Sequence, residues 1–140
     1  MSVYADASLL VALFSVDAFT ARARDFLREL EPTLVVSDFA AAELASALAK
    51  KLRVRDLSAD EVRSAFASFD AWAGSRGPRL ETTTADVSRA EAILRRLDLA
   101  LRTPDALNLA IAERHEASLA TFDVRMAESA RALGLEVASV

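Results

Sequence analysis

Short apolar runs alternate with longer stretches of mixed apolar and polar residues along the whole chain. The uncharged, mostly β-branched run Thr33–Val36 is typical of a strand covered on both faces. The longer stretches place apolar residues every three to four positions, which is typical of helices. The pattern predicts strands at Val3–Ala5, Thr33–Val36 and Arg79–Thr83, in an apolar run that ends at Thr121–Asp123, and at Glu136–Val140.

Start and stop signals divide the intervening stretches into helices. Ser37 or Asp38 can cap one helix, and Ser58 begins another because Glu61, three residues later, completes the spacing of a capping box. Thr84 is the expected cap of a third. Gly134 marks the end of the last helix. The expected helices are 7–14, 19–30, 39–53, 58–72, 85–100, 103–114 and 124–133.

Alternating strands and helices predict an α/β fold in which one parallel sheet is covered by helices on both faces. The 140 residues are enough for one domain, which we expect to span residues 1–140. The absence of cysteine excludes disulfides and thiolate metal sites and fits a reducing cytosol. The apolar start lacks a basic leader, and no uncharged run approaches the roughly 18 residues of a membrane span.

Four of the 21 acidic residues stand out because each is the sole acid in an apolar neighbourhood. They are Asp6, Glu43, Asp105 and Asp123, and a buried carboxylate is costly unless it is hydrogen-bonded or neutralised. Asp6 and Asp123 follow expected strands, and Asp105 opens a helix, so all three belong to the same edge of a parallel sheet. Glu43, one to two turns into its helix, can reach that edge. Oxygen ligands without Cys or His favour Mg²⁺ or Mn²⁺.

Each of these acids also has a simpler interpretation. Asp6 and Asp123 can cap the helices that follow them, and Asp105 can favour the positive end of a helix dipole. Glu43, inside a helix, has the weakest structural explanation. His115, the only histidine, is interpreted as a helix C-terminal cap, and Trp72 as a core or protein-contact residue.

The net charge of −4 argues against a large electrostatic surface for nucleic acid. A nucleic-acid partner would therefore require a local basic patch or a bound cation that offsets the acids. Lys50, Lys51 and Arg53 belong to the one dense basic run. They are explained equally well by a helix C-terminus and by contact with RNA phosphates.

Four segments together resemble a known family. They are VYADASLLVALF, AAELASAL, LRTPDALNLAIA and LATFDVRMAESARALGLEV, and they span nearly the whole chain. In this order and spacing, the chain resembles the PIN domain, specifically the VapC toxins of bacterial toxin–antitoxin pairs. The family's acidic positions correspond to Asp6, Glu43, Asp105 and Asp123, and its small hydroxyl residue to Ser8. Two nearby positions depart from the family pattern, with Ala7 in place of a frequent Thr and Asn108 in place of a frequent His.

The resemblance implies a three-layer α/β/α sandwich with a central, mostly parallel sheet of four to five short strands. It also implies a cytoplasmic, Mg²⁺- or Mn²⁺-dependent endoribonuclease toxin that forms a homodimer and is inhibited by a small antitoxin. Asp6 and Asp105 would be the main metal ligands, with Glu43 and Asp123 binding directly or through water. The ion would activate water for attack on an RNA phosphodiester. Candidates for orienting that water or the phosphate are Ser8, Thr103, Asn108 and Thr121.

Two other functions remain open. A catalytically inactive PIN-like scaffold would keep the fold without binding metal. A phosphoacceptor receiver domain would also gather acids at a sheet edge, but it needs a lysine late in the chain. Lys50 and Lys51, the only lysines, come early, which disfavours that alternative.

Overall fold

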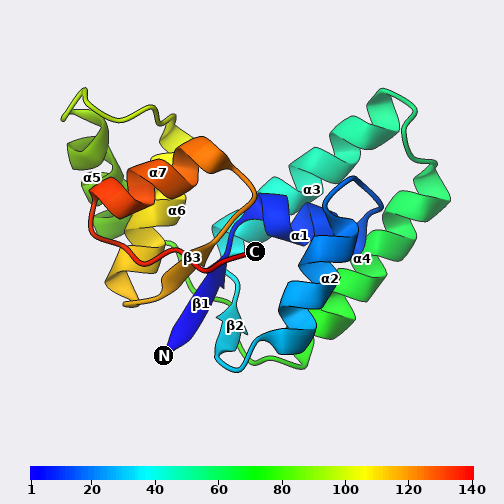
Figure 1. The fold of residues 1–140 in the computed structure, drawn as a ribbon. Helices are drawn as coiled ribbons and strands as arrows, with labels where there is room; N and C mark the ends of the chain where they lie inside the picture. The colour runs from blue at the N-terminus through cyan, green and yellow to red at the C-terminus, as the bar shows by residue number, and fades with distance from the viewer.

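The structure is a computed structural model that describes all residues from 1 to 140. Its centre is a sheet of three parallel strands in the order β2-β1-β3 (Figure 1). The strands are β1 (Ser2–Ala5), β2 (Thr33–Val35) and β3 (Ser118–Ala120). Because all three run the same way, their carboxyl ends share one edge of the sheet.

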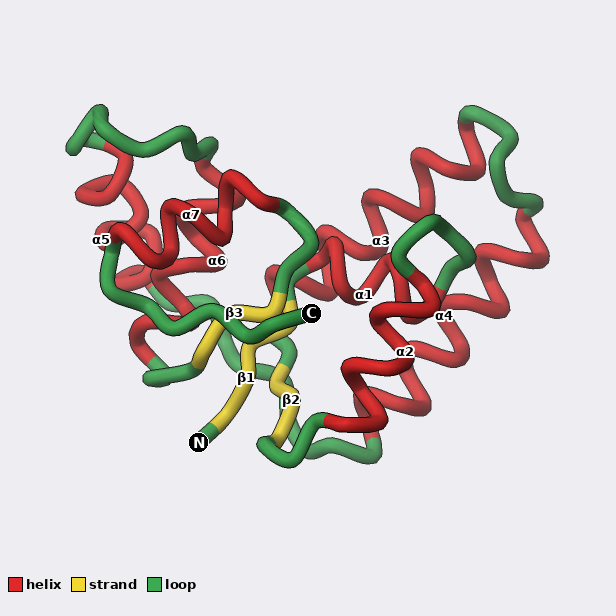
Figure 2. The backbone as a smooth tube through the Cα atoms, in the orientation of Figure 1, coloured by secondary structure: helices red, strands yellow, loops and turns green.

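Seven helices surround this small sheet. Figure 1 shows α1 to α4 on one side of it and α5 to α7 on the other, so the architecture has three layers. The same separation is visible in the backbone trace of Figure 2. The helices are α1 (Ala7–Phe14), α2 (Thr20–Glu29), α3 (Asp38–Arg53), α4 (Ala59–Gly74), α5 (Thr84–Leu94), α6 (Thr103–Arg114) and α7 (Val124–Ala132).

The prediction of four to five strands was wrong, because two of the expected strands make only isolated bridges. The segment 79–83 pairs with Ser37 only at Leu80. Beyond that residue, the backbone N–H of Thr82 donates to the Asp38 carboxylate (3.1 Å), which diverts it from a strand ladder. The segment 136–140 pairs with β3 only at Val137. Both segments therefore lie against the sheet without extending it.

The helix starts were predicted more accurately than one helix end. Ser37 caps α3, and Ser58 forms the expected capping box with Glu61. The cap of α5 is Thr83 rather than Thr84, with Asp86 completing a second capping box. This helix ends at Leu94 instead of Ala100, because the chain turns through Leu97 in the left-handed region (φ 62°).

The apolar core is continuous across the sheet. It contains Tyr4 and Leu119 from the strands together with buried side chains from every helix. α6 is the most enclosed helix, with a run of seven consecutive buried residues from Ala106 to Ala112. It packs against α5 on one side and β3 on another. Asp105, in the first turn of α6, is therefore followed by residues that are held in the core.

No helix in the chain combines the length and apolar character needed to cross a bilayer.

One buried ion pair joins α5 to α6. Asp86 is 1% exposed and accepts two hydrogen bonds from Arg114, at 2.7 and 2.9 Å. Arg114 also donates to the carbonyl of Glu81 (2.7 Å). Burial alone would raise the pKa of Asp86, but the hydrogen bonds from Arg114 and Thr83 lower it overall.

We expect Arg114→Met to lower the free energy of unfolding by about 2–3 kcal/mol, because Asp86 would stay buried without its charged partner. This is below the loss for a fully buried pair because Arg114 is partly exposed and Thr83 still donates to Asp86. Urea denaturation at pH 7 measures the change. Arg89→Met is the matched control, because the exposed pair Arg89–Glu113 should contribute about 1 kcal/mol or less. Equal losses in the two variants would contradict the prediction.

Candidate functional site

Asp6 lies where β1 ends and α1 begins, with its carboxylate held by neutral donors. One oxygen, Oδ1, accepts from the Ser8 hydroxyl (2.7 Å) and from the backbone N–H of Leu9 (3.1 Å). The other, Oδ2, accepts from the Thr121 hydroxyl (2.5 Å). Thr121 reaches Asp6 because the strand register pairs Ala5 with Ala120, which places the next residues of both strands side by side. Asp6 is 5% exposed.

Ser8 and Thr121 are fixed in turn by backbone groups after β3. Ser8 Oγ accepts from the N–H of Phe122 (2.9 Å), and Thr121 Oγ1 accepts from the N–H of Asp123 (3.0 Å). The single hydroxyl hydrogen of each side chain is already directed at Asp6. These contacts support a role in orienting the Asp6 carboxylate.

Asp123 and Asp105 both occupy helix starts. Asp123 is the N-cap of α7 and accepts from the N–H of Met126 (3.1 Å). Asp105 lies in the first turn of α6 and accepts from the N–H of Arg102 (3.0 Å). The simpler interpretations are thus confirmed for Asp6 and Asp123, which cap their helices. A cap uses only part of a carboxylate, and for Asp105 and Asp123 one oxygen has no protein donor.

Glu43 is half-buried in α3 and is held by Asn108 from α6. The Asn108 amide donates to Glu43 Oε1 (2.5 Å) and to the carbonyl of Pro104 (3.0 Å), and its own oxygen accepts from the Tyr4 hydroxyl (2.5 Å). Sequence reasoning missed Tyr4 and the link from Asn108 to Glu43. The sequence contained one signal for this contact: the only tyrosine of the chain lies inside an otherwise apolar strand, where its hydroxyl needs a hydrogen-bond partner.

The four acids influence one another but have no cationic partner. None of the seven ion pairs in the chain includes Asp6, Glu43, Asp105 or Asp123. Burial raises the pKa of Asp6 and the negative charge of Asp123 raises it further, against the hydrogen bonds from Thr121 and Ser8. Burial likewise raises the pKa of Glu43, as do the charges of Asp6 and Asp105, against the hydrogen bond from Asn108. The site therefore concentrates negative charge that the protein itself does not neutralise.

The side chains do not form a ready-made metal cage. No three Asp, Glu, His or Cys residues come close enough together to hold one ion. The donors nevertheless have the chemistry of a hard-cation site, since carboxylates and hydroxyls suit Mg²⁺ or Mn²⁺. The unneutralised charge and the free carboxylate oxygens fit such an ion, although the side chains would have to move closer together to share it.

The other predicted residues lie around this edge or away from it. Thr103 is exposed at the start of α6, two residues before Asp105. Lys50, Lys51 and Arg53 form the last turn of α3, and Lys50 lies about 10 Å along the helix from Glu43. His115 is the C-cap of α6, at the opposite end from Asp105, as expected. Trp72 packs with Phe14 (ring centroids 5.4 Å apart) at the edge of the core.

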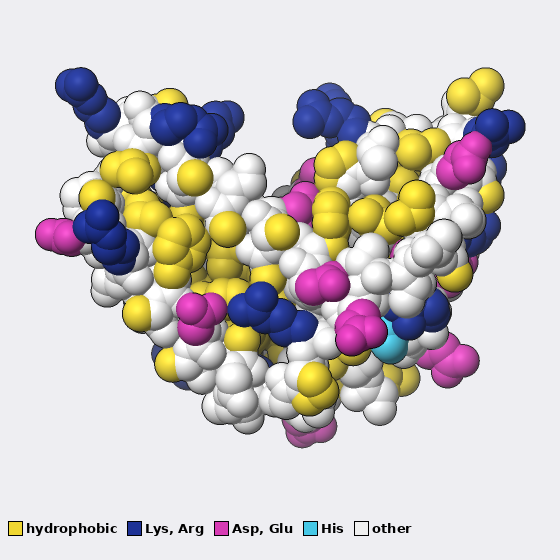
Figure 3. Space-filling model, turned by 180° about the vertical axis from the view of Figure 1, so that it is seen from behind, with side chains coloured by type: hydrophobic (Ala, Val, Ile, Leu, Met, Phe, Trp, Pro, Cys, Tyr) yellow, Lys and Arg dark blue, Asp and Glu magenta, His cyan; other side chains and the backbone are white.

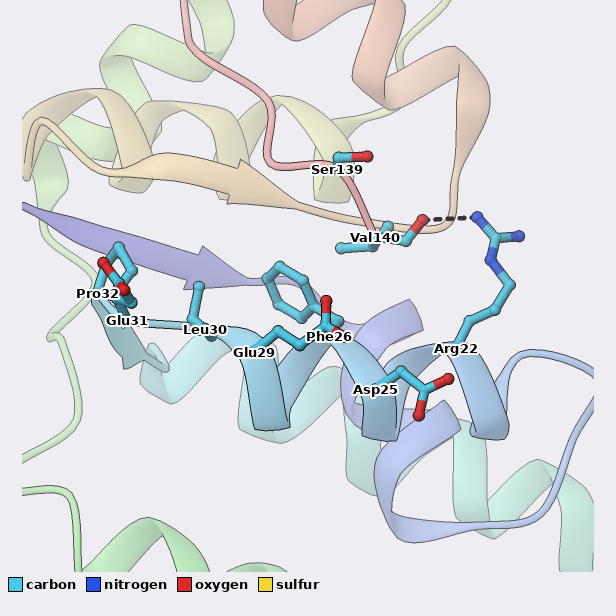
Figure 4. A pocket seen from close by; sticks show the side chains of 9 residues that line it. All are labelled: Arg22, Asp25, Phe26, Glu29, Leu30, Glu31, Pro32, Ser139 and Val140. Carbon is cyan, nitrogen blue, oxygen red and sulfur yellow. Dashed lines mark hydrogen bonds between the residues drawn. The ribbon is translucent and has the colours of Figure 1, made fainter.

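The main cavities do not coincide with the acids. One cavity of about 540 Å³ lies between α2 and the C-terminal segment, where Arg22 donates to the carbonyl of Val140 (2.6 Å) (Figure 4). A second, also of about 540 Å³, lies between α5 and α6 and includes Thr103. None of the five main cavities is lined by any of the four acids. The candidate site is therefore separate from these cavities.

Comparison with protein families decides the classification. The model of the PIN domain matches residues 3–132, which is most of the chain. The chain belongs to the PIN-domain family. Its parallel sheet and flanking helices are thus those of an α/β PIN domain, here with three strands and seven helices. No curated protein matches this PIN domain.

Solved structures of bacterial toxins share this fold. VapC20 from Mycobacterium tuberculosis, a toxin that cleaves the sarcin–ricin loop, is 18% identical with a TM-score of 0.76, and the match covers 99% of each chain. VapBC2 from Rickettsia felis, bound to a DNA fragment from its promoter, is 16% identical with a TM-score of 0.70 and coverage of 99% and 98%. A toxin–antitoxin complex from Klebsiella pneumoniae is 21% identical with a TM-score of 0.64 and coverage of 89% of each chain. At these identities, the likeness establishes the fold.

The raised pKa values predict how the metal-free protein responds to pH. A carboxyl group with a raised pKa binds its proton more tightly in the folded state, so the free energy of unfolding falls as the pH rises above the group's ordinary pKa, 4.5 for Glu43. We expect this fall to be smaller in Glu43→Gln, which keeps an oxygen to accept from Asn108. Urea denaturation at pH 5 and pH 8 in the presence of a chelator measures it. The exposed Glu128→Gln variant is the control, and a fall in Glu43→Gln as large as in wild type would refute the interpretation.

Proposed function

We propose that this PIN domain is the toxin of a toxin–antitoxin pair and acts as a divalent-metal-dependent endoribonuclease. The observation that carries the proposal is that Asp6 and Glu43 are subject to the charges of neighbouring acids, Asp105 and Asp123 among them, and that none of the four has a cationic partner. Such a concentration of charge destabilises the folded state unless a cation binds there. The PIN fold and its likeness to VapC toxins agree with this assignment.

Asp6 and Asp105 would be the main ligands of Mg²⁺ or Mn²⁺, and Glu43 and Asp123 would bind it directly or through water. When bound, the ion supplies Lewis acidity that lowers the pKa of water and stabilises charge on phosphate oxygens. Ser8 and Thr121 hold the Asp6 carboxylate in a fixed orientation. The only histidine lies at the far end of α6, so the site has no imidazole base and depends on its carboxylates.

The shape of the surface is suited to an RNA backbone. Figure 3 shows a hollow between two raised parts of the molecule, with basic side chains on both rims and acidic ones near its base. The end of α3, where Lys50 and Arg53 are exposed, lies on one side of the molecule in Figure 1. The turn from α5 to α6, where Arg95, Arg96 and Arg102 are exposed, lies on the other side. Basic rims allow an acidic protein of net charge −4 to hold a polyanion.

The partners follow from the same proposal. A small antitoxin would bind and inhibit the enzyme, in keeping with the structural likeness to a toxin–antitoxin complex. The toxin would act in the cytoplasm on RNA and would be a homodimer. Covering the exposed apolar side chains Val87 and Leu97 would be one advantage of a protein partner.

An inactive PIN-like scaffold is the second candidate, because no three acids stand within reach of one ion. Binding of Mn²⁺ in solution separates the two functions. An active site should bind Mn²⁺ and lose that binding in Asp6→Asn, whereas a scaffold would bind none in either protein.

We expect Asp105→Asn to reduce Mn²⁺-dependent cleavage of RNA by more than 100-fold, exceeding the roughly 10–100-fold cost of losing an indirect metal partner. The amide keeps an oxygen for the Arg102 N–H, so the fold should remain intact. Cleavage of a mixed RNA substrate and circular dichroism measure the two effects. Asp25→Asn, an exposed acid of α2, should cleave as wild type does. Full activity in folded Asp105→Asn protein would contradict the proposal that Asp105 is a main metal ligand.

Replacing Lys50 and Lys51 by alanine should weaken RNA binding uniformly across sequences, because phosphate contacts carry no base information. For single-stranded RNA, the slope of log K against log salt should become shallower by about 0.7 for each lost contact. Binding to catalytically inactive Asp105→Asn protein at several salt concentrations measures this. Arg131→Ala, in the last turn of α7, is the control and should keep the wild-type slope. An unchanged slope in the Lys50/Lys51 variant would show that these lysines stabilise the C-terminus of α3 and do not contact RNA phosphates.

A further inference from the structure

A chain of buried hydrogen bonds begins at the start of α3 and returns to the same helix at Glu43. The Ser37 hydroxyl lies 2.6 Å from the Tyr4 hydroxyl, which lies 2.5 Å from the oxygen of the Asn108 amide. The amide nitrogen of Asn108 donates to Glu43 Oε1 (2.5 Å). Ser37 and Tyr4 are fully buried, and Asn108 is 3% exposed. The chain thus joins β1, α3 and α6 and ends on a carboxylate of the candidate site.

The orientation of the Asn108 amide is fixed by its neighbours. The Pro104 carbonyl, 3.0 Å from Nδ2, can only accept a hydrogen bond. The amide NH₂ must therefore face Pro104 and Glu43, which leaves Oδ1 facing Tyr4. A reversed amide would place its oxygen against two acceptors and would leave the Tyr4 hydroxyl without one.

The direction of every bond then follows from counting hydrogens. Tyr4 has one hydroxyl hydrogen, and Asn108 Oδ1 can only accept, so Tyr4 donates to Asn108. Ser37 must consequently donate to the oxygen of Tyr4. Ser37 Oγ in turn accepts from the backbone N–H of Ala40 (2.9 Å). All donors point the same way, toward Glu43, and aligned bonds in a low-dielectric interior strengthen one another.

A core network that serves only packing would not need this arrangement. Phenylalanine at position 4 would fill the same space in the strand without requiring any partner. The hydroxyl of Tyr4 has its effect through Asn108, whose amide holds the Glu43 carboxylate. Glu43 has no other hydrogen-bond donor and no ion pair, so its position depends on Asn108.

We infer that Tyr4 and Asn108 are positioning residues that fix the Glu43 carboxylate for phosphodiester cleavage, Tyr4 acting through Asn108. This inference rests on the proposed function and assigns it two residues outside the acidic set. Asn108 is also where the chain departs from the frequent histidine of VapC-like sequences, and its amide supplies the donor for Glu43 at that position.

Steady-state cleavage of RNA with Mn²⁺ by Tyr4→Phe tests this inference. We expect kcat to fall about threefold to tenfold, the effect of one neutral hydrogen bond, while KM stays unchanged because no RNA contact is lost. Thr83→Val is the matched control, because it removes a hydroxyl that caps α5 and whose hydrogen bonds are with Asp86, not with Asn108 or Glu43. The control should lose stability but keep its kcat. Equal kcat values in Tyr4→Phe and Thr83→Val would overturn the inference.

A double-variant cycle separates positioning from general destabilisation. If Tyr4 acts only through Asn108, the double variant Tyr4→Phe/Asn108→Leu should have the same kcat as Asn108→Leu alone. Independent structural roles would instead multiply the two losses, and that result would overturn the inference.

Amide exchange of the wild-type protein without metal tests the contacts independently of activity. The side-chain NH₂ of Asn108 should exchange slowly by NMR and should exchange faster in Tyr4→Phe than in Thr83→Val. If this holds but wild type neither binds Mn²⁺ nor cleaves RNA, the proposed function fails while the hydrogen-bond chain stands. If exchange is the same in the two variants, the positioning chain is refuted even in an active enzyme.

Discussion

The structure depends on an acidic sheet edge whose carboxylates are oriented by neutral donors. Asp6 receives two hydroxyls and a backbone N–H, and Glu43 receives an amide, but no lysine or arginine pairs with either. Neutral donors fix the direction of a carboxylate without cancelling its charge. The pKa values of Asp6 and Glu43 are consequently raised by burial and by neighbouring acids. This combination of order and unbalanced charge is what a cation-binding site requires.

The two layers of helices meet through these same contacts. Thr121, which follows β3, holds Asp6 at the start of α1, while Asn108 from α6 holds Glu43 in α3. Between α5 and α6 the balance is reversed, since Asp86 is neutralised by Arg114. This contrast separates a carboxylate paired for stability from the unpaired carboxylates to which we propose a function.

Sequence patterns predicted the placement of the acids better than their contacts. Asp6 and Asp123 were located because strand and helix signals meet at those positions, and the capping box at Ser58 was found from spacing alone. The predictions of strands at 79–83 and 136–140 were wrong, because a β-prone run forms a strand only if a neighbouring strand pairs with it along its length. Asp86 was overlooked because its partner, Arg114, is 28 residues away.

The sequence by itself determined the family, the alternation of strands and helices, and which four carboxylates are the sole acids of apolar neighbourhoods. These features depend on residues close together in the chain, where periodicity and capping rules apply. Only the tertiary structure decided that Thr121 orients Asp6 and that Ser37, Tyr4 and Asn108 form a directed path to Glu43. Those contacts join residues up to 115 positions apart, and they require the register of β1 with β3 and the packing of α6 beside α3.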